Sequence, residues 1–271
     1  MNRGLLIKTM REVWFGTLVF GFALALFQAL LAYILPTFYT QLAETLGQLP
    51  FVQAIFEGLL GTDLGGTVGP AAMTSFAWVH PIVLALIWAH EITFCTRMPA
   101  GEIDRGTIDV LLSLPISRIR MYLCETTVWA GSGLVVVLMG LLGNWIGGRF
   151  VPDEFQRTPK QLTIVVLNLY CLYLAVGGGA WLVSALSDRR GRAVGIIFGV
   201  VLASFLLNFL AQFWGPAEGL SFLSVLTYYR PLRIVQNSAW PIADMLVLTI
   251  VGAAFWLGGA IVFTRRDIST V

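Results

Sequence analysis

Six long uncharged stretches constrain this chain more than any other feature of its sequence. Each lacks Asp, Glu, Lys and Arg over at least the ~20 residues that a helix needs to cross a bilayer. The stretches are residues 13–43, 64–90, 126–148, 161–187, 193–217 and 245–264. The sequence therefore predicts an all-α polytopic membrane protein with a single transmembrane domain over 1–271. We expect its spans near 14–35, 71–94, 124–146, 162–186, 193–213 and 243–264.

The composition agrees with a membrane location and argues against other classes. Hydrophobic residues make up 57% of the chain and charged residues 12%, whereas about a quarter of a soluble domain is charged. The net charge is +2 and no basic tract occurs, so we expect no nucleic-acid partner. The first uncharged run is much longer than the ~7–15 apolar residues of a signal peptide, which indicates a retained helix. Cys95, Cys124 and Cys171 lack metal-ligand spacing, and we expect reduced structural thiols.

The distribution of Lys and Arg predicts the orientation in the membrane. With six spans, both termini lie on one side. The segments on that side carry twelve Lys and Arg, and those on the other side carry five. By the positive-inside rule the termini and the polar insert at 101–120 are cytoplasmic. Residues 1–12 are expected to form an interfacial amphipathic helix, with Leu5 and Leu6 on its apolar side.

Two loops are expected on the opposite side. Residues 44–70 are rich in glycine and contain acids but no bases. Residues 214–242 are too apolar for a solvated loop. We expect short re-entrant or interfacial helices there, which are tolerated where protein covers their backbone.

The insert between the second and third spans is unusually polar for this chain and is bounded by helix-breaking residues. Pro99, Ala100 and Gly101 are expected to end the preceding helix. Thr107 or Asp104 could cap a short helix that stops at Pro115. Ile108, Leu111 and Leu112 share one face of it, and Ser117 is placed to cap the next helix. A two-turn helix needs something to pack on, either the protein's own helices and lipid or a groove on a soluble partner.

Several motifs together resemble the permeases of ABC-2 type transporters. In the insert these are Gly101-Glu102, Arg105-Gly106-Thr107, the stretch LLSLP at 111–115, and Ser117-Arg118. Elsewhere they are His90-Glu91, YYRPL at 228–232 and FTRRDI at 263–268. Six spans with both ends inside also match that family. Cys124-Glu125 departs from it, since a basic residue is common at that point, and the role of Glu125 stays open.

The resemblance implies a non-enzymatic permease subunit of an ATP-driven transporter, a multi-pass protein of a prokaryotic plasma (inner) membrane and most commonly an exporter. The chain contains no GxxxxGK[ST] motif, so ATP and Mg would bind to separate ATPase subunits, expected to be two, and a second permease subunit would complete the complex. The insert would be the coupling helix that contacts the ATPase. Its expected contact residues are Glu102, Arg105, Gly106, Thr107, Ile108, Asp109, Leu111, Leu112, Pro115, Ser117 and Arg118.

Polar and small residues within the spans allow a structural and a functional interpretation. Glu91 is expected near the inner boundary, in an ion pair with Arg97 or a loop arginine, although a gating role stays possible. Asn144, Asn168, Asn208 and Gln212 could join helices or face a pathway. The pairs Gly143/Gly147 and Gly195/Gly199 are expected to mark close helix packing rather than a dimer seam.

The same sequence offers only incomplete motifs for an intramembrane protease or a metal site. Ser132 lies in AGSG, close to the GxSG motif of rhomboid proteases, but both histidines precede it, so we expect a packing residue. His90-Glu91 lacks the second histidine of HExxH, and no metal site is expected. An ATP-independent carrier and a membrane anchor for a cytoplasmic complex remain the alternatives. No motif identifies a substrate.

Overall fold

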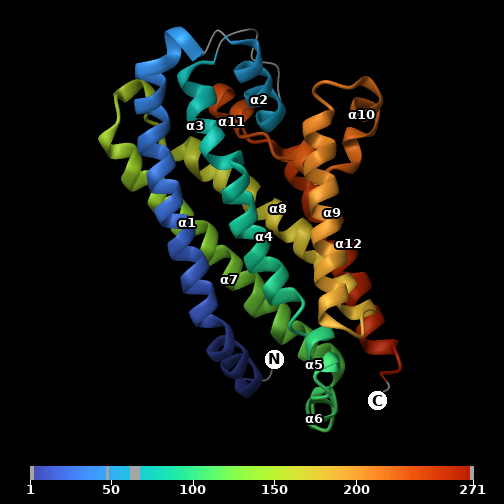
Figure 1. Cartoon of the computed structure of the whole chain (residues 1–271). Coiled ribbons are helices and arrows are strands. Elements are labelled where there is room, and N and C mark those ends of the chain that lie inside the picture. Colours follow the sequence, from blue (N-terminus) through green and yellow to red (C-terminus); the bar gives the residue numbers. More distant parts are fainter. Residues whose placement is uncertain (1–2, 47–48, 62–67, 269–271) are drawn as a thin grey trace.

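Helices form nearly all of the described chain. The computed structural model describes residues 3–46, 49–61 and 68–268, and no strand occurs within those ranges. Long helices run roughly side by side, and both termini lie at one end of the bundle (Figure 1). The α-helices are α1 (Arg3–Leu46), α2 (Pro50–Leu60), α3 (Pro70–Val79), α4 (Pro81–Cys95), α5 (Ala100–Asp104), α6 (Ile108–Leu112), α7 (Arg118–Gly147), α8 (Pro159–Leu186), α9 (Arg190–Leu210), α10 (Gly215–Leu220), α11 (Pro231–Asn237) and α12 (Ile242–Arg265). The 3₁₀ turns are η1 (Gly148–Phe150), η2 (Asp153–Phe155), η3 (Ser221–Leu223) and η4 (Val225–Tyr228).

Six segments in the described residues are long and apolar enough to cross a membrane, as the sequence predicts. They are Arg3–Tyr39, Pro70–Cys95, Arg118–Phe150, Asp153–Leu186, Arg190–Leu210 and Ile242–Arg265. Their burial differs widely. In the most apolar 18-residue stretch of each span, 67% is buried in the fourth span and only 17% in the fifth. The fourth span is therefore central in the bundle, whereas the fifth lies at its periphery.

The second span departs from the continuous helix expected over 71–94. It consists of α3 and α4, separated at His80, whose backbone is outside the helical region (φ −55°, ψ 131°). Pro81 explains the break, because it lacks an N–H and disfavours helical geometry in the residue before it. The His80 ring restarts the helix by accepting a hydrogen bond from the backbone N–H of Ile82 at 3.3 Å.

The first span is a second correction. One continuous helix, α1, includes residues 3–12, where the sequence suggested a separate interfacial helix. Leu5 and Thr9 on this part of α1 are buried, so that face packs against the protein's own helices. No helix-breaking residue separates this part from the apolar run that follows, since Pro36 is the proline within α1 and lies far along it.

Small residues bring two pairs of helices together. A Cβ atom added at Gly143 or Gly147 of α7 would overlap the carbonyl oxygens of Ala25 and Ala29 in α1. A Cβ atom at Gly178 of α8 would overlap the backbone of α12 in the same way. The prediction of close packing is confirmed for Gly143/Gly147.

The other glycine pair was predicted wrongly. Gly195 and Gly199 of α9 are exposed, and a Cβ at either would meet no heavy atom within 4 Å. They mark no close helix contact within the described chain.

The loops at the end away from the termini are largely helical. Residues 214–242 contain α10, η3, η4 and α11, in agreement with the short helices expected there. Leu226, Tyr229 and Leu232 are buried, so this segment packs onto the bundle. In the other loop, α1 continues to Leu46 and α2 follows it, while Gly65 and Gly66 lie outside the described residues.

Candidate functional site

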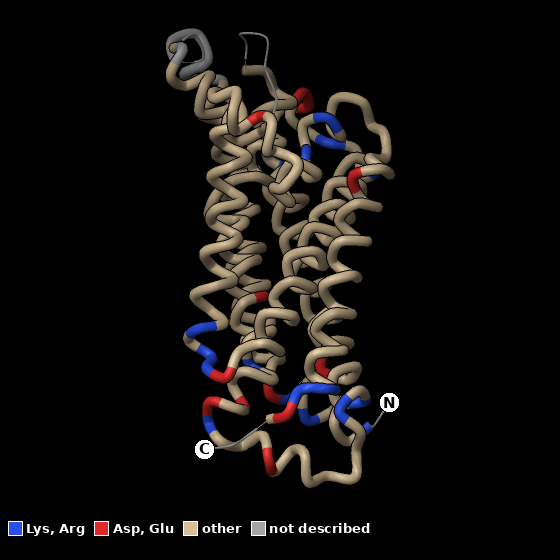
Figure 2. The backbone as a smooth tube through the Cα atoms, turned by 90° about the vertical axis from the view of Figure 1, so that its right-hand side faces the viewer, with Lys and Arg blue, Asp and Glu red and all other residues tan. Residues whose placement is uncertain are grey.

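The polar insert forms a projection at the end of the bundle that holds the termini. Helix α5 lies at the level of the ends of the long helices there, and α6 extends beyond them (Figure 1). Most charged residues gather at the same end (Figure 2). The insert is thus a discrete feature outside the apolar part of the bundle.

The path of the insert depends on two glycines and differs from the expected helix break at 99–101. Ala100 and Gly101 lie inside α5. A Cβ at Gly101 would come within 3.0 Å of the Thr96 carbonyl oxygen, and the Gly101 N–H donates to that oxygen at 3.0 Å. Gly106 has φ +69°, a left-handed conformation that favours glycine. This turn redirects the chain from α5 into α6.

The expected cap of the short helix is absent. Thr107 precedes α6, but its side chain makes no capping hydrogen bond. Its hydroxyl instead donates to Glu102 Oε2, and Arg105 Nη2 pairs with Glu102 Oε1 at 2.6 Å. Ser117 occupies the position before α7, also without a capping bond from its side chain. The polar side chains of the insert therefore stabilise the α5–α6 turn.

Hydrogen bonds from α5 connect the insert to two more spans, α9 and α8. Asp104 Oδ2 accepts from the backbone N–H of Arg190, the first residue of α9, at 3.3 Å. The Arg190 side chain donates to the Thr93 carbonyl at 3.2 Å. The Ala100 N–H lies 3.4 Å from Ser184 Oγ of α8. The sequence analysis did not predict this role of Arg190, because in sequence it is one of several arginines in a loop.

The apolar face of α6 is only partly available to a partner. Ile108 has no exposed surface, so it cannot contact another molecule in this conformation, contrary to expectation. Leu111 and Leu112 are half-buried. The most accessible apolar side chains are Val110, 68% exposed, and Leu114, 42% exposed. Neither was singled out in the sequence, because the spacing rule favours residues that share a face with Ile108.

Arg118 also makes an internal contact. Its Nη1 donates to the Arg266 carbonyl, just beyond α12, at 2.6 Å. Arg266 in turn donates to the Ala185 carbonyl at 2.9 Å and pairs with Asp188. Arg118 therefore joins the foot of α7 to the end of α12.

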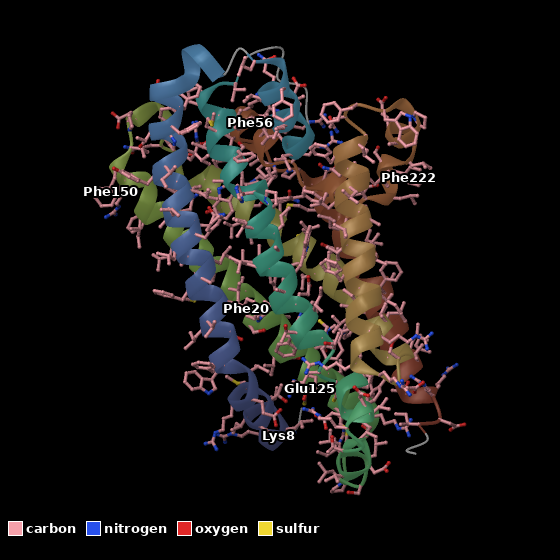
Figure 3. The ribbon with its side chains drawn as sticks, viewed as in Figure 1. Lys8, Phe20, Phe56, Glu125, Phe150 and Phe222 are labelled. Carbon is pink, nitrogen blue, oxygen red and sulfur yellow. The ribbon has the colours of Figure 1, made fainter. Side chains whose placement is uncertain are left out.

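An ion-pair network beside the insert includes two of the predicted residues. Arg97 pairs with Glu125 of α7 and with Glu12 of α1. Thr9 donates to Glu125 at 2.7 Å, and Lys8 pairs with Glu12 at 3.1 Å. Figure 3 shows Lys8 and Glu125 at this end of the molecule. Glu125 thus has a role as the buried partner of Arg97, and Glu12 is a member that the sequence analysis missed.

Glu91 does not join this network, and its expected ion pair with Arg97 is wrong. Its side chain is fully buried and has no ion-pair partner among the described residues. The carboxyl lies against the backbone of Gly177 in α8, where a Cβ would overlap it. Glu91 lies one helical turn before the end of α4, and the carboxylates that pair with Arg97 are those of Glu12 and Glu125.

Amide side chains join separate helices and turns elsewhere in the bundle. Asn144 donates to Gln28 Oε1 at 3.1 Å, and Gln28 donates to the Ala77 carbonyl at 3.1 Å, which links α7, α1 and α3. Asn168 donates to the Tyr228 carbonyl at 3.3 Å. Asn208 accepts from the Thr227 hydroxyl at 3.4 Å. These contacts favour the interhelical interpretation for the three asparagines.

Comparison with curated proteins finds a distant relative. The chain is 23% identical over 205 residues to a protein described as "Probable ABC transporter permease YtrC" from Bacillus subtilis (strain 168). The match covers 69% of this chain and 58% of that protein, so the chain spans well under two thirds of its relative's length. No family model matches the chain, and no solved structure matches it. The chain is therefore a permease-like helical membrane protein, similar to a probable ABC transporter permease.

Proposed function

We propose that this chain is the permease subunit of an ATP-binding cassette transporter and that residues 101–118 dock on a separate ATPase. The observation that carries the proposal is the projecting insert, which exposes Val110 and Leu114 beyond the end of the bundle. Exposed aliphatic side chains on a short, internally braced helix suit an apolar cleft on a soluble partner. The name of the relative supports an ATPase as that partner.

The exposure of the side chains changes which residues are proposed to dock. Val110 and Leu114 make the central apolar contact, with Leu111 and Leu112 at its edge. Glu102, Arg105 and Asp109 set orientation and association rate through their charge. Gly106, Pro115 and Ser117 shape the backbone.

The hydrogen bonds that connect the insert to α8 and α9 support a role in transmitting movement. A displacement of α6 passes along the chain into α4 and α7. It also passes through the Asp104–Arg190 and Ala100–Ser184 hydrogen bonds into α9 and α8. Four spans would therefore respond when the ATPase moves the insert, and a solute pathway beside them would open or close.

The remaining parts of the complex follow from the same proposal. We assign ATP and Mg to a separate ATPase polypeptide, since these 271 residues contain no GxxxxGK[ST] motif that would hold nucleotide phosphates. Two ATPase subunits and a second permease subunit complete the transporter. The insert and both termini face the cytoplasm of a prokaryotic cell, as the distribution of Lys and Arg favours, and the complex works as an exporter.

Copurification tests the proposal directly. The chain would be coexpressed with the ATPase encoded beside its gene, as wild type and as the double variant Val110→Asp/Leu114→Asp. Phe150→Asp is the control, because Phe150 is 72% exposed in η1 at the opposite end. The measurements are the amount of ATPase recovered and its rate of ATP hydrolysis.

The double variant is expected to lose the ATPase while keeping the elution profile of the folded protein, and the control is expected to retain it. Equal recovery from both variants would show that the insert is not the docking segment. If wild-type protein recovers no ATPase, the carrier or the membrane-anchor interpretation replaces the transporter.

A further inference from the structure

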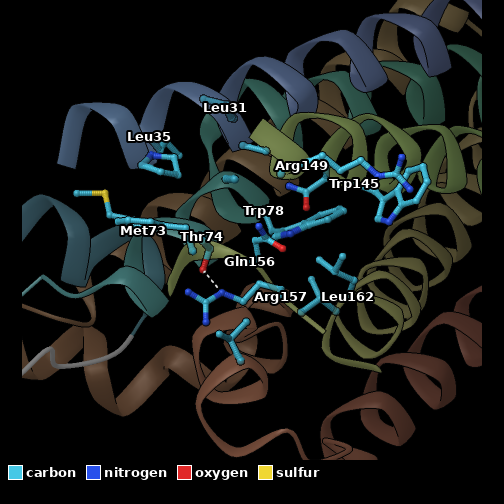
Figure 4. A pocket seen from close by; sticks show the side chains of 18 of the residues that line it. Leu31, Leu35, Met73, Thr74, Trp78, Trp145, Arg149, Gln156, Arg157 and Leu162 are labelled. Carbon is cyan, nitrogen blue, oxygen red and sulfur yellow. Dashed lines mark hydrogen bonds between the residues drawn. The ribbon is translucent and has the colours of Figure 1, made fainter. Parts of the chain in front are cut away.

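A cavity of about 280 Å³ lies between the spans at the end away from the termini. Helices α1, α3, α7 and α8 and the loop through η1 and η2 enclose it (Figure 4). This volume is near the lower limit of ligand pockets, which begin at ~300 Å³. The cavity can hold a small headgroup and a few methylene groups.

Most of the cavity wall is apolar. Leu31 and Leu35 come from α1, Met73 and Trp78 from α3, and Leu162 from α8. An empty space between such side chains stays dry or takes an apolar group. The wall is therefore suited to an alkyl chain.

Two arginines interrupt this apolar lining. Arg157 is half-buried, its Nε donates to Thr74 Oγ1 at 2.9 Å, and its Nη2 donates to the Glu154 carbonyl at 2.9 Å. The guanidinium of Arg149 lies 3.5 Å from the centre of the Trp145 ring. Neither has a carboxylate within 4 Å in the described part of the chain.

The acids of the same loop do not neutralise these cations. Asp153 accepts a hydrogen bond from Gln156 at 3.0 Å, and neither Asp153 nor Glu154 lines the cavity. Arg149 is exposed, whereas Arg157 is partly buried, and a partly buried cation without an anion is unfavourable. Arginine binds phosphate and carboxylate groups through paired N–H donors. The charge at the rim is thus complementary to an anionic headgroup.

The α1 helix contributes an additional polar atom. Pro36 lies inside α1 and lines the cavity together with Ala32. Because proline lacks an N–H, the carbonyl of Ala32 loses its helical donor. A hydroxyl or amine beside the anionic group of a ligand could donate to that carbonyl.

We propose that this cavity binds an anionic amphiphile, with its phosphate or carboxylate at Arg157 and the first part of its alkyl chain between α1 and α3. The amphiphile is either a lipid of the surrounding membrane or a free single-chain molecule. The inference does not rest on the proposed ATPase partner, since no residue of the insert takes part.

Binding of dodecyl phosphate provides the test. The wild-type protein would be reconstituted in nanodiscs of phosphatidylcholine, and binding of radiolabelled dodecyl phosphate would be measured by scintillation proximity. Inorganic phosphate and the neutral detergent dodecyl glucoside serve as competitors. We expect dodecyl phosphate to bind saturably, and each competitor to be at least tenfold weaker.

Three variants examine the site itself. Arg157→Gln is expected to weaken binding at least tenfold. Ala32→Phe fills the cavity and keeps both arginines, and it should weaken binding by a similar factor. Lys160→Gln removes an exposed charge from the first turn of α8, close to Arg157 in sequence but not on the cavity wall, so its affinity should equal that of the wild type. The unfolding temperature of each variant checks its folding.

The outcomes separate the alternatives. Wild-type affinity in both Arg157→Gln and Ala32→Phe would overturn the proposal. Equal competition by inorganic phosphate or by dodecyl glucoside would overturn it as well, since the site would then select only charge or only the alkyl chain. Repeating the experiment in nanodiscs with phosphatidylglycerol identifies the source: lost binding of the probe indicates a membrane lipid, and retained binding indicates a free amphiphile.

Discussion

The two ends of the bundle use their charges in different ways. Every ion pair in the described residues lies at the end that holds the termini, and these pairs involve Lys8, Arg97, Arg105 and Arg266. At the other end no described cation has a carboxylate within 4 Å. Those cations are Arg149, Arg157, Lys160, Arg230 and Arg233.

Arg230 shows what the absence of partners means at that end. It lies outside the spans and donates to the Thr227 carbonyl at 2.8 Å. Burial lowers its pKa, and the neighbouring charge of Arg233 lowers that pKa further, while Asp244 opposes the shift. Burial and the repulsion from Arg233 thus outweigh the attraction of Asp244.

This difference in ion pairing indicates a different role for each end. At the end with the termini, ion pairs join separate helices and stabilise the region where the insert meets the bundle. Such rigidity suits a segment that transmits force. At the other end, the arginines are left for solvent or a bound anion. The predictions below change one end at a time and are ordered by the size of the expected effect.

The largest effect is expected for Glu125→Gln. Glu125 is 4% exposed and Arg97 16% exposed at the side chain. The variant leaves Arg97 with Glu12, which is 39% exposed, as its remaining ion-pair partner, and breaking a buried pair costs about 3 kcal/mol. The free energy of unfolding would be measured by titration with a denaturing detergent.

Glu12→Gln is the matched control for that variant. Glu12 is 39% exposed, and exposed pairs contribute at most about 1 kcal/mol. Equal losses in Glu12→Gln and Glu125→Gln would contradict the view that the buried pair is the structural centre of this end.

Gly143→Ala is expected to have the next largest effect. The added Cβ would overlap the Ala25 carbonyl and force α1 away from α7, and overpacking costs about 1–3 kcal/mol. Gly195→Ala adds the same atom to an open position and should change the free energy of unfolding by less than about 1 kcal/mol. A large loss in Gly195→Ala would instead reveal a packing partner outside this chain.

Gly106→Ala changes only the turn of the insert. A left-handed conformation costs a non-glycine residue about 1 kcal/mol, and the φ of Gly106 is +69°. The loss is confined to the α5–α6 turn, so the unfolding transition of the bundle should hardly move. Coupled ATP hydrolysis with the coexpressed ATPase should fall. Unchanged hydrolysis would show that the geometry of this turn is unimportant for coupling.

Glu91→Gln is expected to have the smallest effect. A buried carboxyl without a counter-charge is favoured in its neutral form, and glutamine keeps that shape without charge. We expect a change below about 1 kcal/mol in the free energy of unfolding, in contrast to Glu125→Gln. A loss as large as that of Glu125→Gln would indicate an ionised Glu91 with an undetected partner.

The six spans could be predicted from the sequence because an uncharged run of sufficient length leaves few alternatives. Pro81 indicates the helix break at His80 in the sequence, but the uncharged run on both sides favoured one continuous helix. The two GxxxG pairs look alike in sequence and differ in the structure. Only the position of neighbouring helices decides whether Gly143 or Gly195 meets a partner.

The candidate site was predicted as a segment but not residue by residue. Its bounds follow from Pro99, Gly106 and Pro115. Helical spacing grouped Ile108 with a docking face, but the turn at Gly106 directs Ile108 inward and Val110 outward. The pairing of Arg97 with Glu125 rather than Glu91 depends on how the helices pack in space, which one sequence does not encode.

Photocrosslinking from position 110 tests the central claim most directly. A photoreactive amino acid would replace Val110, and in a second sample Phe150, in cells that also produce the neighbouring ATPase. We predict a crosslinked species with the mass of permease plus ATPase from position 110 and none from position 150. An ATPase adduct from position 150, or crosslinks from position 110 only to lipid or to the chain itself, would contradict the account.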